Sequence, residues 1–410
     1  MKKLMLVMAV WCLFYEAQAQ DYAVNVGVSN VNVVADRSQD RDGDLVRTKS
    51  FSRTFAVDRS DKINLNNQFG SIVVKVWDRK EVKLDISIIA SSSNVNEAQK
   101  LIDEVTVAVE KTGDLISGKT SIGRGNRWSS GRNKKREVKI NYVVYMPAIN
   151  ALTVTQQFGN VTLGDLSGAL SANVQYGNLV AGNLSSLNNY IDVQYGKTNI
   201  AEANKIVIKQ QYGSGLTLGN VGSLDIDAQY VGVHIGNVRG NAIIKQQYGS
   251  GLTLASVNNL NLDIQYATAN ITAIKGTAVI DQQYNSLKIG SVGKITIRSE
   301  YAGVNIGALR GDGSFRMSYN DLNLNDIGAG CKNLTIDADY VDVNLNFNPG
   351  YNADFNVRRS YGSFKYGSNI KARVSGDDDD SSNKRYTGKI GNGGGAIVNI
   401  VTEYGNVTFK

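Results

Sequence analysis

An internal repeat is the feature of this sequence that most limits its fold. Residues 208–218 recur unchanged as residues 244–254, an offset of 36. A looser unit of half that length contains one aromatic residue, usually preceded by Gln and often followed by Gly. A unit this short cannot bury its apolar face alone, so the pattern indicates one small element stacked many times.

The aromatic residues mark successive units. They recur every 17 to 19 residues at Phe158, Tyr176, Tyr195, Tyr212, Tyr230, Tyr248, Tyr266, Tyr284, Tyr301 and Tyr319, with divergent copies at Phe69, Tyr340, Tyr361 and Tyr404. Apolar residues alternate up to each aromatic and again after it, one residue out of phase, which indicates two short strands joined by a corner. We therefore predict an all-β fold, a single-stranded parallel β-solenoid of about fourteen coils of ~18 residues, on the order of 65 Å long.

Two longer segments interrupt the repeats, and we expect them to cap the ends of the stack. In residues 91–139, Asn94 predicts a helix N-terminus, a hairpin turn is expected at 112–114, and 138–146 is typical of an edge strand. The second segment, 363–394, predicts a hairpin. The predicted division is a signal peptide (1–19), a flexible N-terminal segment (20–50), a first coil with its capping insertion (51–156), regular repeats (157–362), and a C-terminal insertion loop with the final coil (363–410).

The N-terminus predicts export. Lys2 and Lys3 precede an apolar run, and Ala17-Gln18-Ala19 has the small-x-small pattern of a signal-peptide cleavage site. We expect an extracytoplasmic protein, in the periplasm or on the cell surface. Cleavage after Ala19 leaves Cys331 as the single cysteine, so the stability of the mature chain is expected to come from packing and not from a disulfide.

Three stretches resemble a known family. They are Ile63-x-Leu65-x-Asn67-Gln68-Phe69-Gly70-x-Ile72-x-Val74-x-Val76-Trp77, Val144-Tyr145-Met146-Pro147, and Leu152-x-Val154-x-x-x-Phe158-Gly159-x-Val161-x-Leu163. Together they are similar to the putative adhesin family of bacterial β-strand-repeat proteins, of the putative auto-transporter adhesin type. The resemblance covers roughly residues 50–410. It implies a right-handed β-helix outside the cytoplasm with an adhesive or surface role. The matched residues are core positions and turn glycines, so they are specific for the architecture and give little information about activity.

The aromatic series is the first candidate for function. Strand parity puts Tyr230 in phase with Leu224 and Ile226, so we expect the rings to point inward or to wedge a corner as a structural ladder. The ladder comprises Tyr176, Tyr195, Tyr212, Tyr230, Tyr248, Tyr266 and Tyr284. The preceding glutamines are in the outward phase, where they could bond between coils or contact a glycan.

A basic loop is the second candidate. It holds the densest positive charge in the chain, with one aromatic residue among the cations: Arg124, Arg127, Trp128, Arg132, Lys134, Lys135 and Arg136. Several cations acting together favour contact with acidic glycans or lipid phosphates, and a solvated loop is the alternative. The formal net charge of the whole chain is only +7, which does not indicate a nucleic-acid partner.

Sequence motifs for catalysis are missing. The single histidine, His234, excludes a multi-histidine metal centre, and no nucleophile-elbow, zinc-protease or P-loop motif is present. Asp377 to Asp380 lack the alternating spacing of a calcium loop. No apolar run reaches the ~18 residues of a spanning helix after the N-terminal segment. We expect the protein not to be an enzyme and to bind no cofactor or metal. We expect it to be an interaction protein that binds a glycan or another cell-surface component. A purely structural envelope protein and a polysaccharide-acting β-helix enzyme are the alternatives.

Overall fold

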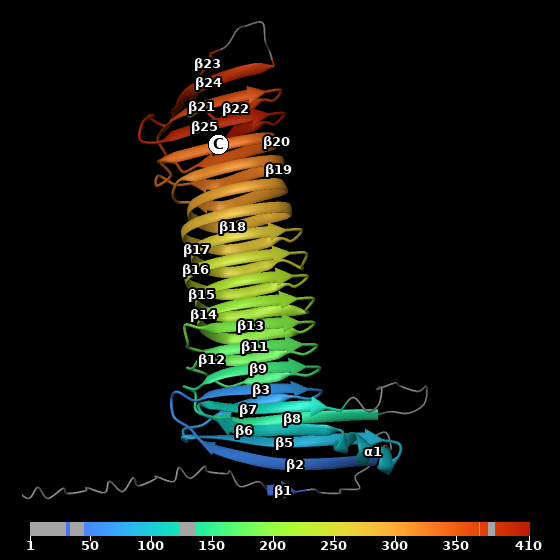
Figure 1. The fold of residues 1–410 in the computed structure, drawn as a ribbon. Helices are drawn as coiled ribbons and strands as arrows, with labels where there is room; N and C mark the ends of the chain where they lie inside the picture. The colour runs from blue at the N-terminus through green and yellow to red at the C-terminus, as the bar shows by residue number, and fades with distance from the viewer. Residues whose placement is uncertain (1–29, 33–44, 124–135, 369, 376–381) are drawn as a thin grey trace, which may run out of the picture.

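The protein is a rod of stacked β-strands (Figure 1). The computed structural model describes residues 30–32, 45–123, 136–368, 370–375 and 382–410. A sheet region with one short helix forms the N-terminal end, and a β-solenoid of about 10 turns with ~19-residue coils follows it. The all-β solenoid expected from the repeat is therefore confirmed, while the number of regular turns is smaller than fourteen. The handedness of the coil stays a prediction.

Each coil has two strand segments that belong to opposite faces. We call the segment before the aromatic residue the first face and the segment after it the second face. In the early coils the two are separate strands: β9 (Ala151–Gln157), β11 (Leu170–Gln175) and β13 (Asn189–Gln194) on the first face, and β10 (Val161–Leu163) and β12 (Leu179–Leu184) on the second.

Four later strands run from the second face of one coil into the first face of the next: β14 (Lys197–Gln211), β15 (Gly215–Gln229), β16 (Val233–Gln247) and β17 (Leu252–Gln265). Strand β18 (Ala269–Leu309) continues through the aromatic corners at Tyr284 and Tyr301. Strands β19 (Gly313–Ile327) and β20 (Asn333–Phe347) run from the first face through the corner into the second face of the same coil.

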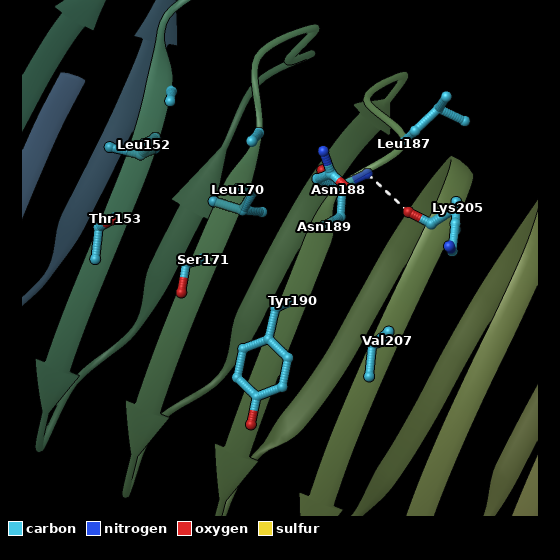
Figure 2. Close-up of a pocket in the computed structure, with 12 residues that line it drawn as sticks. Leu152, Thr153, Leu170, Ser171, Leu187, Asn188, Asn189, Tyr190, Lys205 and Val207 are labelled. Carbon is cyan, nitrogen blue, oxygen red and sulfur yellow. Dashed lines mark hydrogen bonds between the residues drawn. The ribbon is translucent and has the colours of Figure 1, made fainter. Parts of the chain in front are cut away.

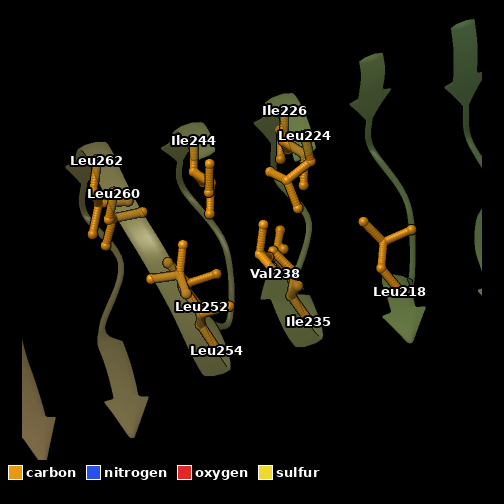
Figure 3. Close-up of a cluster of buried hydrophobic side chains, with 14 of the residues drawn as sticks. Leu218, Leu224, Ile226, Ile235, Val238, Ile244, Leu252, Leu254, Leu260 and Leu262 are labelled. Atoms are coloured by element: carbon orange, nitrogen blue, oxygen red, sulfur yellow. The ribbon is translucent and has the colours of Figure 1, made fainter. Parts of the chain in front are cut away.

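Neighbouring coils pair in parallel and in register. Ile208 lies beside Ile226 on the first face, and Leu218 lies beside Ile235 on the second. Alternate side chains therefore stack into columns, inward columns being mostly aliphatic and outward columns mostly polar. Figure 3 shows the two inward sets meeting, with Leu224, Ile226 and Ile244 opposite Ile235 and Leu254. One continuous apolar core runs the length of the rod.

Three buried glutamines explain the 36-residue repeat. Gln210, Gln246 and Gln282 lie two residues before the aromatic corner in alternate coils, fully buried, while the coils between carry Ala228 and Ile264 at the same place. Each Nε2 donates to corner backbone carbonyls, as in Gln246 Nε2 to Val231 O at 2.9 Å. The amides therefore satisfy polar backbone that the turn would otherwise bury without partners.

The N-terminal end extends the stack and then covers it. On one side the order is β1 (Asn30–Asn32), β2 (Leu45–Ala56), β5 (Glu81–Ser92), β8 (Arg136–Met146), β4 (Ile72–Val76) and β10. On the other it is β6 (Val105–Thr112), β7 (Leu115–Ile122), β3 (Lys62–Gln68) and β9. Helix α1 (Val95–Asp103) begins at Asn94, whose side chain accepts from Asn96 N, and packs against β2 and β5.

Two sequence predictions at this end need correction. Residues 138–146 are not an edge strand, because β8 pairs with β4 on one side and with β5 on the other. Strand β2 begins at Leu45, inside the segment expected to be flexible, because it pairs with β5 along its whole length. The predicted helix start at Asn94 and the hairpin turn between β6 and β7 are confirmed.

The C-terminal end departs from chain order. Strands β25 (Ile397–Glu403) and β26 (Val407–Phe409) pair with β20 on one side, and with β21 (Ala353–Ser360) and β22 (Phe364–Tyr366) on the other. Strand β24 (Asn383–Ile390) adds to β21, and β23 (Ile370–Ser375) adds to β24. The predicted hairpin is present, and the coil of residues 397–409 is inserted beneath residues 353–366 (Figure 1).

Candidate interaction surface

An unbroken ladder of aromatic rings runs along one corner of the rod. Each ring stacks on the next with centroids 4.5 to 5.4 Å apart and planes within 3 to 13°. We call these fourteen residues the aromatic strip: Phe69, Phe158, Tyr176, Tyr195, Tyr212, Tyr230, Tyr248, Tyr266, Tyr284, Tyr301, Tyr319, Tyr340, Tyr404 and Tyr361, in spatial order. Since each step is about 5 Å, the strip is roughly 65 Å long.

All fourteen residues have a left-handed backbone, with φ between 50 and 63°. This conformation costs a residue with a Cβ about 1–2 kcal/mol, and glycine would adopt it without that cost. Stacked aromatic pairs contribute about 0.5–1.5 kcal/mol each beyond area burial, which is comparable to the strain. Ring stacking therefore offsets the backbone strain of an aromatic residue at a position that favours glycine.

The left-handed backbone also overturns the expected ring direction. Parity predicts that Tyr176 points inward, because Val174 is buried and Gln175 faces outward. The positive φ of Tyr176 breaks the alternation and turns its Cβ out of the core, so 51% of the residue is exposed. The tyrosines do form a ladder at a corner, as predicted, but the inward direction was wrong.

The glycine after the aromatic residue is the signal that could have revealed this corner. A Cβ on Gly177 would lie 1.8 Å from the carbonyl oxygen of Gly159 in the coil below, so backbones of adjacent coils touch there. A Tyr-Gly pair at a fixed spacing thus predicts a tight corner with close backbone approach.

The strip presents ring edges and hydroxyl groups, because neighbouring rings cover one another's faces. From Phe158 onward its members are 39 to 59% exposed. The hydroxyls interact along the row: a hydrogen bond with Tyr284 raises the pKa of Tyr266, and the neighbouring charge of Tyr319 raises that of Tyr301. Both raised pKa values keep the hydroxyls of Tyr266 and Tyr301 protonated at neutral pH, and a tyrosine hydroxyl can both donate and accept a hydrogen bond.

Two polar columns lie beside the strip on the first face. The nearer is the predicted outward glutamine column, in which Gln157 Nε2 donates to Gln175 Oε1 at 3.2 Å and Gln247 to Gln265 at 3.4 Å. The next alternates in charge from coil to coil through Asp192, Lys209, Asp227, Lys245 and Asp263. The alternation ends at Asp281, whose pKa is raised by burial and by the adjacent Asp263. The face is polar and nearly neutral.

A shallow hollow of about 400 Å³ lies on the same face, across the coils of β9, β11 and β13 (Figure 2). Tyr190 lies on its floor, Leu187 projects from a turn at its edge, and Asn189 Nδ2 donates to Lys205 O at 2.9 Å. Tyr190 is 37% exposed and belongs to no ring stack in the described chain. It was not singled out from sequence because it has no counterpart at the repeat interval.

The basic loop contributes one described residue. Arg136 begins β8 and its Nη2 lies 3.0 Å from Glu97 Oε1 of α1, an ion pair that ties the helix to the sheet. Arg124, Arg127, Trp128, Arg132, Lys134 and Lys135 lie outside the described residues, as do Asp377 to Asp380. His234 is exposed on the second face, away from the strip.

The described part of the chain contains neither a cluster of metal ligands nor a helix that could span a membrane. No group of three or more His, Cys, Asp or Glu side chains there could hold a metal ion. No helix within these ranges is long and apolar enough to cross a membrane. Cys331, the described cysteine, is a buried free thiol.

Comparison with known proteins gives neighbours among solved structures only. No family of proteins and no curated protein matches the sequence. A putative adhesin from Parabacteroides distasonis is 14% identical, with 66% of this chain and 97% of that chain covered and a TM-score of 0.24. A putative adhesin from Bacteroides fragilis is 15% identical, with 67% and 97% covered and a TM-score of 0.22.

A putative cell adhesion protein from Clostridium sporogenes is 7% identical, with 89% of this chain and 99% of that chain covered and a TM-score of 0.16. These structural neighbours are described as putative adhesins and a putative cell adhesion protein. Identities this low say nothing about what this chain binds.

Proposed function

We propose that this chain is an exported, non-enzymatic interaction rod that binds an extended glycan, or another elongated component of the cell surface, along its aromatic strip. The observation that carries the proposal is the strip itself, which exposes one aromatic edge per coil over the whole rod. A straight row with one contact per coil suits a polymer with a regular repeat better than a compact ligand.

The chemistry of the strip fits a hydroxyl-rich polymer. Tyrosine hydroxyls both donate and accept hydrogen bonds, and the adjacent glutamine amides add further donors and acceptors. Since ring faces are already stacked, sugars would contact the ring edges and hydroxyl groups of the strip. Many weak contacts in one row add up through multivalency.

A purely structural role is the second candidate, and one observation favours it. From Phe69 to Tyr266, the main-chain N–H of each strip residue donates to a carbonyl of the next coil, as in Tyr212 N to Gln229 O at 3.0 Å. The strip therefore helps to hold adjacent coils together whether or not it binds a ligand.

Replacing tyrosines by phenylalanine separates these two roles. Phe69 and Phe158 show that phenylalanine fits the stack, so a variant with Tyr212, Tyr230, Tyr248 and Tyr266 changed to Phe keeps the ring ladder and loses four hydroxyls. The matched control changes one outward column of the second face in the same four coils, Thr217, His234, Thr253 and Asn270, to Ala.

We expect binding of the wild type to polysaccharides on a glycan array, at least about tenfold weaker binding by the Phe variant, and no change for the control. Unchanged melting temperatures would show that the rods are intact. Full binding by the Phe variant would remove the strip hydroxyls from the interface, and absence of any glycan binding by the wild type would leave the structural role.

The basic loop belongs to the same proposal as a second contact. Changing Arg132, Lys134, Lys135 and Arg136 to Ser should weaken binding of acidic glycans, and glycan binding that survives this change removes the loop from the mechanism. Export is tested by cell fractionation with surface proteolysis, in which a cytoplasmic, protease-protected protein would contradict it.

A further inference from the structure

Four connections meet around a hollow of about 480 Å³ where the N-terminal sheet joins the first regular coil. They are the loop between β2 and β3, the turn between β4 and β5, the turn between β8 and β9, and the connection between β10 and β11, which contributes Ser167. The hollow is on the order of the volume that small-ligand sites occupy. It is separate from the aromatic strip, which lies at the opposite ends of β3 and β9.

The walls of the hollow are fixed by hydrogen bonds between the connections. Val57 N donates to Lys80 O at 3.0 Å, and Trp77 N to Met146 O at 3.1 Å. Buried Asn150 clamps the β2–β3 loop, its Nδ2 donating to Asp58 O at 2.6 Å and Asp61 O at 2.9 Å. A ligand would therefore meet a largely preformed site, which lowers the entropy cost of binding.

Exposed cations line the hollow without carboxylate partners. Arg59, Arg79 and Lys80 form no ion pair among the described residues. Two acids share the rim, Asp78 and Asp58, and hydrogen bonds from Ser60 lower the pKa of Asp58. The rim thus offers unpaired cations for an anionic group and carboxylates that accept from hydroxyl donors.

An aromatic wall adds contact surface. The Trp77 ring is held by Nε1 donating to Glu81 O at 2.7 Å, and the guanidinium of Arg79 lies 5.2 Å from its centroid. The ring of Tyr145 is 5.2 Å from Trp77, with the ammonium of Lys75 5.4 Å above it. Partly exposed aromatics beside cations, such as Trp77 and Tyr145, are typical of contact sites.

The wall also contains a buried acceptor without a partner. Asn150 is 1% exposed, lines the hollow, and its Oδ1 has no hydrogen-bond partner. A buried amide oxygen left unsatisfied costs stability, so it is suited to a donor that the ligand supplies. Inorganic phosphate or sulfate would need only the cations, whereas a hydroxylated ligand would use the acceptors as well.

We propose that this hollow binds an acidic sugar unit, with Arg59, Arg79 and Lys80 holding its carboxylate, Asn150 and the rim acids accepting from its hydroxyls, and Trp77 packing against its ring. The proposal does not depend on the aromatic strip. It adds a charge-selective site at one end of a rod whose first face is nearly neutral.

Isothermal titration calorimetry of the full chain with tetragalacturonate tests the site. The first variant changes Arg59, Arg79 and Lys80 to Gln. A matched control removes the same charge from the second face of the solenoid and its turns by changing the exposed Lys275, Lys288 and Lys294 to Gln. A Trp77→Phe variant keeps an aromatic ring in the wall, and circular dichroism verifies that each variant is folded.

We expect the triple variant at the hollow to bind at least about tenfold more weakly, the control triple to bind as the wild type does, and Trp77→Phe to bind more weakly than the control. A neutral tetragalactose should bind more weakly than the acidic probe. Equal losses of affinity in both triple variants would show that the effect comes from net charge alone, and would overturn the proposed site. Equal affinity for the acidic and the neutral probe, or no binding of tetragalacturonate, would also overturn it.

The strip variant with four Tyr→Phe changes separates this proposal from the preceding one. Because the hollow lies away from the strip, that variant should bind tetragalacturonate as the wild type does. If it also lost the acidic probe, the site would be on the strip and not in the hollow.

Discussion

At the scale of single residues, strand parity predicts most of the core and fails at one kind of position. Alternation correctly puts Leu224 and Ile226 inside and the glutamine before each tyrosine outside. It fails at the tyrosine, where a positive φ reverses the side chain's direction. An argument from strand parity assumes an extended backbone at every residue, so it cannot predict a single left-handed residue. The Tyr-Gly pair does indicate such a residue.

A buried polar network near the N-terminal end leads to a pH prediction. The Tyr142 hydroxyl lies 2.9 Å from Thr120 Oγ1, which donates to Asn67 Oδ1 at 2.8 Å. Burial raises the pKa of Tyr142 to about 12 from 10.0, and the hydrogen bond with Thr120 lowers it slightly. The folded protein therefore holds this phenol in its neutral form more strongly than the unfolded chain does.

Stability should consequently be lost as the pH rises from 10 toward 12. Each unit of pKa difference is worth about 1.4 kcal/mol, so Tyr142 contributes on the order of 2–3 kcal/mol to that loss. In Tyr142→Phe we expect the free energy of unfolding, measured by urea denaturation between pH 8 and 11, to fall less steeply above pH 10. Identical slopes for the two proteins would show that Tyr142 does not titrate differently on unfolding.

At the scale of elements, local signals predict the helix and hairpins, while pairing over long distances stays hidden. The cap at Asn94 and the turn between β6 and β7 depend on a few adjacent residues. The sequence does not reveal that β8 lies between β4 and β5, or that β25 pairs with β20. In each case the paired strands are far apart in the chain.

The inserted strand β25 gives a prediction with an internal control. Ile400 is 1% exposed and lies between Ile336 and Val357, whereas Ile397 in the same strand is 53% exposed. Ile400→Asp buries an unpaired charge, and we expect a loss of more than about 3 kcal/mol in the stability of this end. Ile397→Asp should be tolerated.

Hydrogen exchange measures the effect strand by strand. In Ile400→Asp, protection should fall in β20, β21 and β24 and persist in β15 and β16, because coils contact only their neighbours. Uniform loss of protection along the rod would contradict this local view, and normal protection throughout would show that β25 does not hold the end together.

At the scale of the whole molecule, the repeat predicts the solenoid but overstates the number of regular turns. Aromatic residues continue into both end regions, so counting them includes coils whose strands also pair with capping elements. The hollow near Trp77 could not be predicted from the sequence either, because it is built from four connections that lie far apart in the chain.

The two-coil repeat allows a shorter rod to be designed. Deleting residues 212–247 joins Gln211 to Tyr248 and restores the same local sequence, with strand register, corner and buried glutamine intact. We expect a folded protein about 10 Å shorter, since two coils of about 4.8 Å are lost. Small-angle X-ray scattering measures the length, and circular dichroism measures the melting temperature.

Deleting residues 212–238 is the control. It removes one and a half coils and joins one first-face segment directly to another, without an aromatic corner or a second face. This variant should unfold locally or aggregate. Equal folding of both deletions would mean that coil register does not govern the stack.

At the C-terminal end, the order of the strands in space differs from their order in the chain, which constrains the order in which they can pair during folding. Residues 353–366 can pair with the stack only after residues 397–409 have paired with β20, although residues 397–409 come later in the chain. If the coils add to the rod one after another in chain order, that order is broken at this point. Gene duplication can lengthen the interior without disturbing this step, so such rods are free to grow from the centre but not from that end.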